Sequence, residues 1–178
     1  GNKILRTVRD VQFKEPLMKF SSACPGCGET GYVRLISQLF GERLVISNAT
    51  GCSSIWGGNA SSVPYFVSKN GLNPAWQNSL FEDAAEFGFG MYLSHKSMRK
   101  KMFSLVKDLS SLSSNNELTN ICLKYIKTFD SGNENFDVSL ELIDKLSKSN
   151  ENLKQKKKVL LNKEYVSKKS FWVIGGDG

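Results

Sequence analysis

The spacing of hydrophobic residues predicts helices and strands in alternation at the two ends of the chain. Apolar residues recur three and four positions apart over residues 30–40, which favours a helix, and Gly41 is suited to end it. The run 44–46 is short, apolar and rich in β-branched residues, so it predicts a buried strand, as does the run 171–174. A helix, a strand and a glycine-rich loop in this order are typical of an α/β domain whose loops at the strand ends bind ligands.

The same periodicity predicts further helices between these two strands. A helix is expected over residues 81–94, with acidic residues suited to its first turn. Apolar faces with helical spacing follow within residues 98–109 and 118–129. Another helix is expected near residues 138–153, after a polar loop at 131–135. The middle of the chain is therefore expected to be helical.

Composition divides the chain into regions of two kinds. Residues 1–93 and 170–178 contain the glycine-rich and cysteine-rich segments and are expected to belong to one domain with a parallel sheet flanked by helices. Residues 94–169 are rich in Lys, Ser, Asn and Leu and are expected to form a helical connector. With 178 residues in all, a second full domain is not expected.

The location of the protein is inferred from its apolar runs and its cysteines. No stretch approaches the roughly 18 consecutive apolar residues that span a bilayer, and no basic-then-apolar leader opens the chain. The 4 cysteines are too sparse for a disulfide scaffold, so reduced or metal-bound thiols are expected. The sequence therefore predicts a cytoplasmic protein, or one of another reducing intracellular compartment, without a membrane partner.

The net charge of +7 is concentrated in the second half of the chain. Residues 1–95 carry eight Lys or Arg and seven Asp or Glu, whereas residues 96–178 carry sixteen and ten. The lysines recur with apolar positions three and four apart, which favours a solvated helical face over a nucleic-acid-binding stripe. We expect no nucleic-acid partner. A basic helical interaction protein stays an alternative for residues 96–169.

Three cysteines lie where they are suited to bind an inorganic centre. Cys24 and Cys27 are separated by two residues, a spacing that suits zinc, an iron–sulfur cluster or a redox dithiol, or that leaves two unliganded thiols in a loop. Cys52 lies in a second glycine-rich loop. Cys122 is expected to be a small core residue, and the single histidine, His95, an ordinary surface residue. A small zinc-binding interaction module is therefore an alternative, although structural zinc normally takes four protein ligands.

Two further positions have both a binding and a structural interpretation. The segment Gly175-Gly176-Asp177-Gly178 follows a predicted strand, where glycines allow close approach of a phosphate and an aspartate can hold a divalent cation. A Gly-Asp-Gly sequence is also common in turns. Glu29 either orients a ligand or favours the start of the helix that follows it.

Together these segments resemble pyruvate:ferredoxin (flavodoxin) oxidoreductase. The resemblance is carried by Ser-Ala-Cys-Pro-Gly-Cys-Gly-Glu-Thr at 22–30, Asn-Ala-Thr-Gly-Cys-Ser-Ser-Ile-Trp-Gly-Gly at 48–58, Pro-Ala-Trp-Gln-Asn-Ser-Leu-Phe-Glu-Asp at 74–83 and Glu-Phe-Gly-Phe-Gly-Met at 86–91. The terminal Trp-Val-Ile-Gly-Gly-Asp-Gly at 172–178 is similar to the start of the thiamine-diphosphate motif of that family. The fused pyruvate:NADP+ oxidoreductase shares this domain and stays an alternative.

The resemblance implies a thiamine-diphosphate-binding α/β domain next to a [4Fe-4S] cluster. An enzyme of this family decarboxylates pyruvate oxidatively with coenzyme A to acetyl-CoA and CO2, and electrons pass from thiamine diphosphate to the cluster. The implied partners are pyruvate, coenzyme A, ferredoxin or flavodoxin (or a fused NADP+ reductase module), and the remaining domains of the same enzyme. A homodimer is also implied.

The resemblance also implies roles for individual residues. The cluster ligands are expected to be Cys24, Cys27 and Cys52; the thiamine-diphosphate contacts Glu29, Cys52, Gly176, Asp177 and Gly178; and the Mg2+ ligand Asp177. In the family a fourth cysteine, the other Mg2+ ligands and the catalytic residues lie outside the segment that this chain resembles. We therefore expect no catalytic residue in this chain, and expect the chain alone to be inactive and mostly empty of cofactor.

Overall fold

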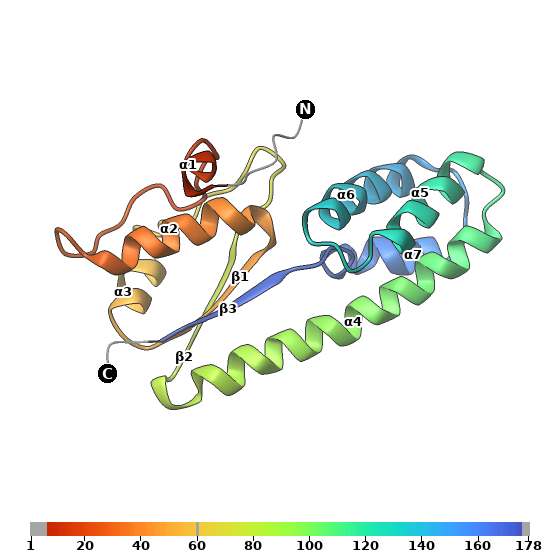
Figure 1. Ribbon diagram of the computed structural model, residues 1–178. Helices are drawn as coiled ribbons and strands as arrows, with labels where there is room; N and C mark the ends of the chain where they lie inside the picture. Colours follow the sequence, from red (N-terminus) through yellow and green to blue (C-terminus); the bar gives the residue numbers. More distant parts are fainter. Residues whose placement is uncertain (1–6, 60, 176–178) are drawn as a thin grey trace. The chain divides into compact units, whose positions relative to one another are not determined.

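A computed structural model describes residues 7–59 and 61–175, which form two compact units. We call residues 7–90 with 170–175 the sheet unit and residues 91–169 the helical unit. The elements run in the order α1 (Val8–Val11), α2 (Gly28–Phe40), η1 (Gly41–Arg43), β1 (Leu44–Ala49), α3 (Cys52–Gly58), β2 (Ala75–Ser79), η2 (Phe81–Asp83), α4 (Ala84–Leu112), α5 (Asn116–Lys127), α6 (Asn133–Lys148), α7 (Lys154–Leu161), η3 (Lys163–Tyr165) and β3 (Ser170–Ile174) (Figure 1). Helix α4 begins in the sheet unit and continues into the helical unit.

The sheet has three parallel strands in the order β2-β1-β3 (Figure 1). Its central strand β1 is buried along its whole length, as expected for a strand covered on both faces. Val45 pairs with Ala75 of β2, and Leu44 pairs with Ser170 of β3. The predicted α/β class with a parallel sheet flanked by helices is confirmed.

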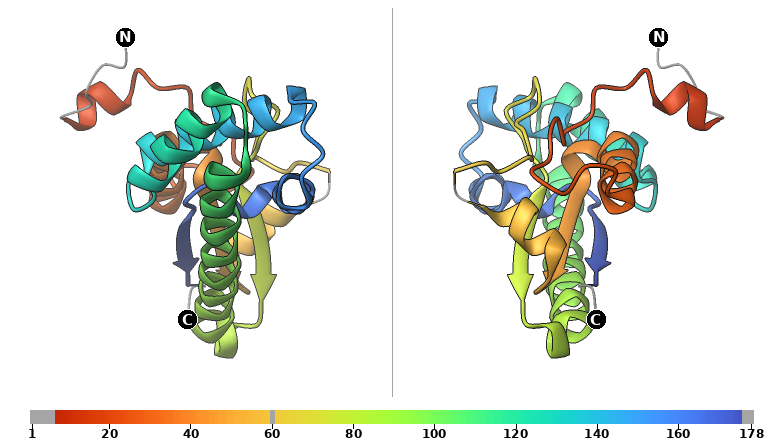
Figure 2. Two further views of the ribbon diagram at one scale, coloured as in Figure 1. Left: turned by 90° about the vertical axis from the view of Figure 1, so that its right-hand side faces the viewer. Right: turned by 90° about the vertical axis from the view of Figure 1, so that its left-hand side faces the viewer.

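Helices cover both faces of this sheet. In Figure 2, α2 and α3 lie on one face, and the first turns of α4 lie on the other. On the first face the rings of Phe40 and Trp172 are 5.4 Å apart. On the second, a Cβ added to Gly88 would lie 2.5 Å from Val173 Cγ2 and 3.1 Å from Ser47 Cβ. The start of α4 therefore approaches the sheet closely because residue 88 has no side chain.

The helical unit is built around one apolar core. Its buried residues come from α4, α5, α6, α7 and the segment after η3: Met102, Val106, Leu109, Leu118, Ile121, Cys122, Tyr125, Val138, Leu142, Leu146, Val159 and Val166. The Tyr125 hydroxyl donates to the Val166 carbonyl at 2.8 Å, so this buried polar group is satisfied.

A buried arginine joins three segments of the helical unit. Arg99 Nη2 donates to Asn135 Oδ1 at 2.9 Å and to the Phe129 carbonyl, and its guanidinium lies 3.8 Å from the centroid of the Phe129 ring. Asn135 Oδ1 also accepts from the Lys168 backbone N–H at 3.1 Å. These bonds hold the α5–α6 connection and the segment leading to β3 against α4.

The element boundaries differ from the sequence predictions at several points. The helices expected over residues 81–94 and 98–109 are one continuous helix, because no glycine or proline interrupts the chain between residues 91 and 112. Part of the loop expected at residues 131–135 is the first turn of α6, where Asn135 is buried against Arg99. The helix expected near residues 138–153 ends at Lys148. Helices α1, α3 and α7 and strand β2 were not predicted.

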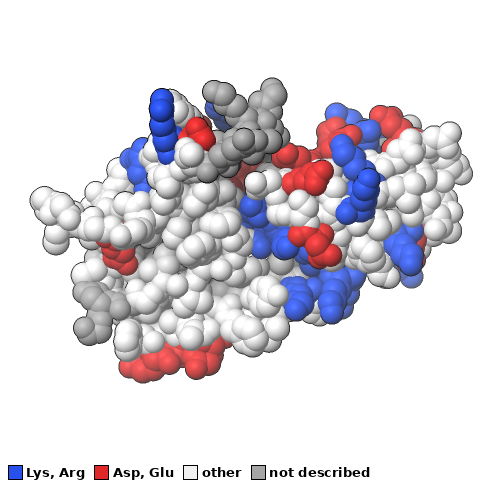
Figure 3. Space-filling view, viewed as in Figure 1, with Lys and Arg blue, Asp and Glu red and all other residues white. Residues whose placement is uncertain are grey.

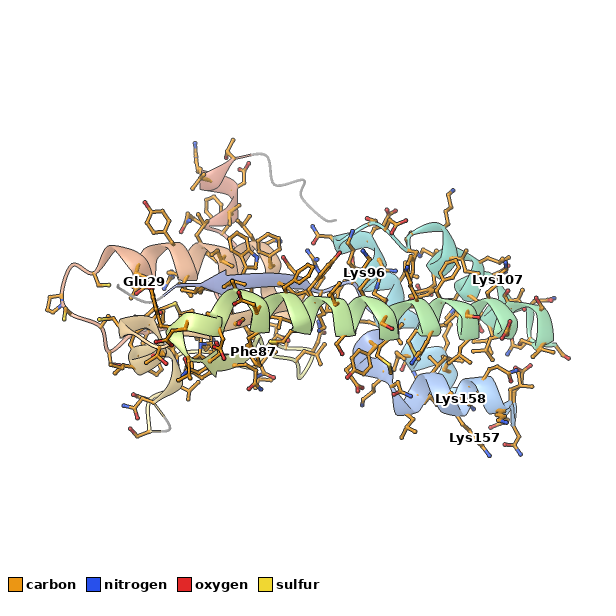
Figure 4. The ribbon with its side chains drawn as sticks, turned by 90° about the horizontal axis from the view of Figure 1, so that it is seen from below. Glu29, Phe87, Lys96, Lys107, Lys157 and Lys158 are labelled. Atoms are coloured by element: carbon orange, nitrogen blue, oxygen red, sulfur yellow. The ribbon has the colours of Figure 1, made fainter. Side chains whose placement is uncertain are left out.

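Charged side chains differ between the surfaces of the two units. On the face shown in Figure 3, the sheet unit has an acidic lower edge, charged side chains of both signs at its upper end and few charges between them, whereas lysines, arginines and acidic residues intermingle over the helical unit. In Figure 4, Lys96 and Lys107 project from α4, and Lys157 and Lys158 from α7. All four are exposed. Within residues 7–59 and 61–175, no helix is long and apolar enough to cross a membrane.

Candidate functional site

The topology places two of the predicted cysteine segments at one edge of the sheet. Helix α2 leads back to the start of β1, so its own start lies near the end where β1 leaves the sheet. Helix α3 begins directly after that end. In Figure 1 the starts of α2 and α3 lie together with the end of β3. We call this region the carboxyl edge of the sheet.

Cys24 and Cys27 flank a tight turn. Gly26 has a φ of 79°, Pro25 precedes it, and the Cys27 N–H donates to the Cys24 carbonyl at 3.0 Å. Proline followed by a residue with positive φ is the signature of a type II turn. The turn holds Cys24 exposed and Cys27 half-buried, with Cys27 as the residue that precedes α2.

Cys52 lies at the start of a helix, not in the glycine-rich loop that the sequence predicted. It is the exposed first residue of α3. The Gly51 N–H donates to Ser54 Oγ at 2.9 Å, and Ser54 Oγ donates to the Gly51 carbonyl at 2.7 Å. These two local bonds stabilise the first turn, which the glycines on both sides of the segment had obscured in the sequence.

A buried asparagine holds the carboxyl edge together. Asn48 is fully buried, its Nδ2 donates to Ser53 Oγ and to the Ala49 carbonyl, each at 2.8 Å, and its Oδ1 accepts from Trp76 Nε1 at 3.2 Å. One side chain therefore joins β1, α3 and β2. No role was predicted for Asn48 from the sequence. The feature of the sequence that could have indicated its role is a polar residue near the end of a strand that is otherwise predicted to be buried.

Glu29 joins the two cysteine segments. The indole of the buried Trp56, on α3, donates to Glu29 Oε2 at 3.4 Å, and Figure 4 shows Glu29 at the start of α2. Beside them the hydroxyl of Tyr65 is buried and has no hydrogen-bond partner among the described residues. Burial and the Glu29 charge both raise the pKa of Tyr65. Residues 24–29 and 52–56 are therefore neighbours across this edge.

The described residues do not form a closed metal site. Within residues 7–59 and 61–175, no group of three or more His, Cys, Asp and Glu side chains is placed to hold a metal ion. All four cysteines are described, and none forms a disulfide. Gly176, Asp177 and Gly178 lie outside the described residues. The roles predicted for the cysteines, Glu29 and these three residues therefore stay predictions.

The two remaining candidates lie in the helical unit. Cys122 is a buried core residue, as predicted, and burial followed by the nearby Glu151 charge raises the pKa of its thiol to about 11. His95 is not the ordinary surface residue that was expected. Its ring is half-buried, lies 5.7 Å from the Tyr165 ring, and has Nε2 3.2 Å from the Ser167 carbonyl.

Known proteins match the chain over nearly its whole length. It is 42% identical over 172 residues to the pyruvate-flavodoxin oxidoreductase of Klebsiella pneumoniae, and 41% identical over 177 residues to the pyruvate:ferredoxin oxidoreductase of Moorella thermoacetica. Each match covers 97% of this chain and 15% of the relative. A pyruvate dehydrogenase [NADP(+)] of Cryptosporidium parvum is 57% identical over 102 residues, which are 57% of this chain and 5% of that protein. No protein-family model matches.

These similarities confirm the resemblance that the motifs predicted. The chain is homologous to one segment of the pyruvate-flavodoxin and pyruvate:ferredoxin oxidoreductases, and it spans about 15% of the length of these relatives.

Proposed function

We propose that this chain is the part of a pyruvate oxidoreductase that separates a thiamine-diphosphate site from a [4Fe-4S] cluster. The whole enzyme would convert pyruvate and coenzyme A to acetyl-CoA and CO2 and pass the electrons to ferredoxin, flavodoxin or an NADP+ reductase module. The observation that carries this proposal is an identity of 41–42% across 97% of the chain to proteins with these names.

The side chains at the carboxyl edge are of the chemical types that such a site needs. Thiolates are the usual protein ligands of iron–sulfur clusters, and two of them here flank a turn whose backbone is fixed by Pro25 and Gly26. The third, Cys52, comes from the segment that the Glu29–Trp56 bond holds next to that turn. Three thiols are one fewer than a cluster normally takes. The fourth ligand would come from another part of the enzyme.

The roles that we propose for individual residues follow from the family resemblance. Cys24, Cys27 and Cys52 would hold the cluster, while Glu29 and the Cys52 segment would contact thiamine diphosphate. Asp177 would bind Mg2+, with Gly176 and Gly178 allowing close approach of the diphosphate. When bound, thiamine diphosphate supplies the carbanion stabilisation that decarboxylation requires. The chain itself would orient that cofactor and hold the electron acceptor beside it.

Serine substitutions in the natural protein that contains this chain test the ligand assignment. Cys24→Ser, Cys27→Ser and Cys52→Ser are each compared with Cys122→Ala, which removes the buried thiol of the helical unit. We expect the three serine variants to lose most of the iron, sulfide and reduced-cluster EPR signal of one cluster, and the Cys122 variant to keep them.

Two outcomes would contradict the proposal. Full iron and sulfide content in the three serine variants would exclude these thiols as cluster ligands. One zinc per chain, lost in the same variants, would favour the zinc-binding module instead. Pyruvate-dependent reduction of a viologen dye, measured on the same preparations, tests the activity separately from the metal content.

A further inference from the structure

A cavity in the sheet unit has no role in the site just described. It has a volume of about 220 Å³ and is lined by Met18, Lys19, Phe20, Ser21, Thr30, Gly31 and Arg34. Five of the seven lining residues are exposed, so the cavity is open to solvent. Its volume is below the range of drug-sized ligand pockets, so only a small molecule fits.

Both walls of this cavity are fixed by hydrogen bonds. On one wall, the Lys19 N–H donates to the Pro64 carbonyl at 3.2 Å, and the Phe66 N–H donates to the Leu17 carbonyl at 2.8 Å. The Phe20 ring packs edge-on against Phe66 at 5.7 Å. The other wall is one face of α2, where residues 30, 31 and 34 are three and four positions apart. The cavity is therefore preformed.

A glycine inside α2 keeps the cavity open. Gly31 lies in the helix, where glycine is less favourable than alanine. A Cβ built on Gly31 meets no atom within 4 Å, so no protein group requires the glycine. Its φ is not in the left-handed region either. Gly31 is exposed, so the space beside it is open to solvent and accessible to a ligand.

The charged groups and hydrogen-bond donors around the cavity match a ligand that carries one negative charge. Lys19 is already paired with Glu15 at 2.7 Å. Arg34 is exposed, and its guanidinium forms no ion pair with any described residue. Ser21 Oγ accepts from the Ala23 N–H at 3.0 Å, so its own hydroxyl hydrogen stays available as a donor. One unpaired guanidinium beside a hydroxyl suits a carboxylate, which arginine binds through two parallel hydrogen bonds.

We propose that this cavity binds a small monocarboxylate with an apolar body. The carboxylate pairs with Arg34 and Ser21, and the apolar part lies over Gly31 against Met18 and Phe20. Inorganic phosphate is disfavoured, because it carries more charge than one guanidinium balances and has no apolar part to cover the aromatic wall. The proposal is independent of the cofactor roles of the cysteines.

Benzoate is the probe, and the whole 178-residue chain is titrated with it while backbone amide shifts are followed by NMR. We expect saturable shifts at residues 19–21 and 30–34 with a millimolar Kd. Arg34→Gln should weaken binding roughly tenfold, the effect of losing about 1.4 kcal/mol of charge-assisted hydrogen bonding. Arg9→Gln, at an exposed arginine of α1, is the matched control and should bind as the parent chain does.

Gly31→Leu fills the cavity and should abolish the benzoate shifts, and Gly31→Ala serves in its place if the leucine variant does not fold. Unchanged affinity in Arg34→Gln would overturn the proposal, as would shifts spread over surface lysines. Equal affinity for inorganic phosphate would overturn the assignment to an apolar carboxylate and leave a simple anion site.

Discussion

The two units of this protein are stabilised in different ways. In the helical unit, twelve buried apolar residues form one contiguous cluster among the described residues. In the sheet unit, ten of the described apolar residues are buried, but the cluster beside the carboxyl edge contains only three of them, Met18, Val33 and Trp56. There, close fits and buried polar bonds hold the elements: Gly88 against the sheet, Gly58 against Trp76, and Asn48 between three elements.

This difference indicates how each unit responds to substitution. A contiguous apolar core accepts swaps that conserve volume and loses stability when volume is removed. A unit held by close fits is instead sensitive to added atoms and to lost hydrogen bonds. The sheet unit also carries the candidate site, so its least tolerant positions surround the residues proposed to bind cofactors.

The largest expected effect is a cavity in the helical unit. Leu142 is fully buried, and Leu142→Ala should lower the free energy of unfolding by about 2–5 kcal/mol, since it removes buried methyl groups from a closed core. Hydrogen exchange read by mass spectrometry should show faster exchange in residues 91–169 than the parent chain shows. Leu161→Ala, at an 80% exposed leucine, is the control and should change little. Equal losses in both variants would contradict a single closed core.

A smaller loss is expected when one methyl group is added to the sheet unit. Gly88→Ala should cost about 1–3 kcal/mol, because its Cβ would lie 2.5 Å from Val173 Cγ2 and force α4 or β3 to move. Gly90→Ala is the matched control on the same helix, where a Cβ meets nothing within 4 Å. That variant should be as stable as the parent or more so, by up to about 1 kcal/mol. Urea denaturation measures both, and a stable Gly88→Ala protein would show that the fit is loose.

The sequence predicted the helical unit better than the sheet unit for the same physical reason. Apolar residues with helical spacing reveal a contiguous apolar core, so the faces within residues 98–109 and 118–129 were recognised. The break expected before residue 98 and the bounds of α6 were nevertheless wrong, and α7 was missed. Close contacts between single residues, by contrast, produce no repeating hydrophobic pattern in the sequence. Strand β2 (Ala75–Ser79) is mostly exposed and polar, and α3 is short and bounded by glycines, so neither was predicted.

At the candidate site, motif resemblance reached further than periodicity. It identified the cysteine segments and Glu29, which the structure places on neighbouring segments of one sheet edge. It gave no role to Asn48, Trp56 or Trp76, because their function here is to hold that edge together through contacts between residues far apart in the sequence. Only the folded arrangement shows which polar groups meet.

A turn substitution tests the sheet unit at the cysteines themselves. Gly26→Ala places a Cβ at a φ of 79° and should cost about 1–2 kcal/mol, because the left-handed region is strained for residues with a side chain. Gly28→Ala, at the start of α2 with nothing within 4 Å, is the control and should be neutral or stabilising. Thermal unfolding measures both. If the two variants unfold at the same temperature, the positive φ of Gly26 does not make the Cys24–Cys27 turn sensitive to an added side chain.

The smallest expected effect concerns the half-buried histidine of the helical unit. Burial lowers the pKa of His95 to about 4, with the charges of Arg99 and Lys169 adding to this, while the bond to the Ser167 carbonyl opposes it. The unfolded chain has a histidine pKa of about 6.5, so it binds more protons than the folded chain between pH 6.5 and 4. Stability should therefore be constant above pH 6.5 and fall as the pH decreases to 4, by on the order of 1 kcal/mol at pH 5 because the ring is partly exposed.

Urea unfolding across this pH range measures how the free energy of unfolding depends on pH. His95→Gln should remove this dependence, whereas Lys96→Gln, at the neighbouring exposed position, should keep it. A slope that survives His95→Gln would assign the acid sensitivity to carboxylates.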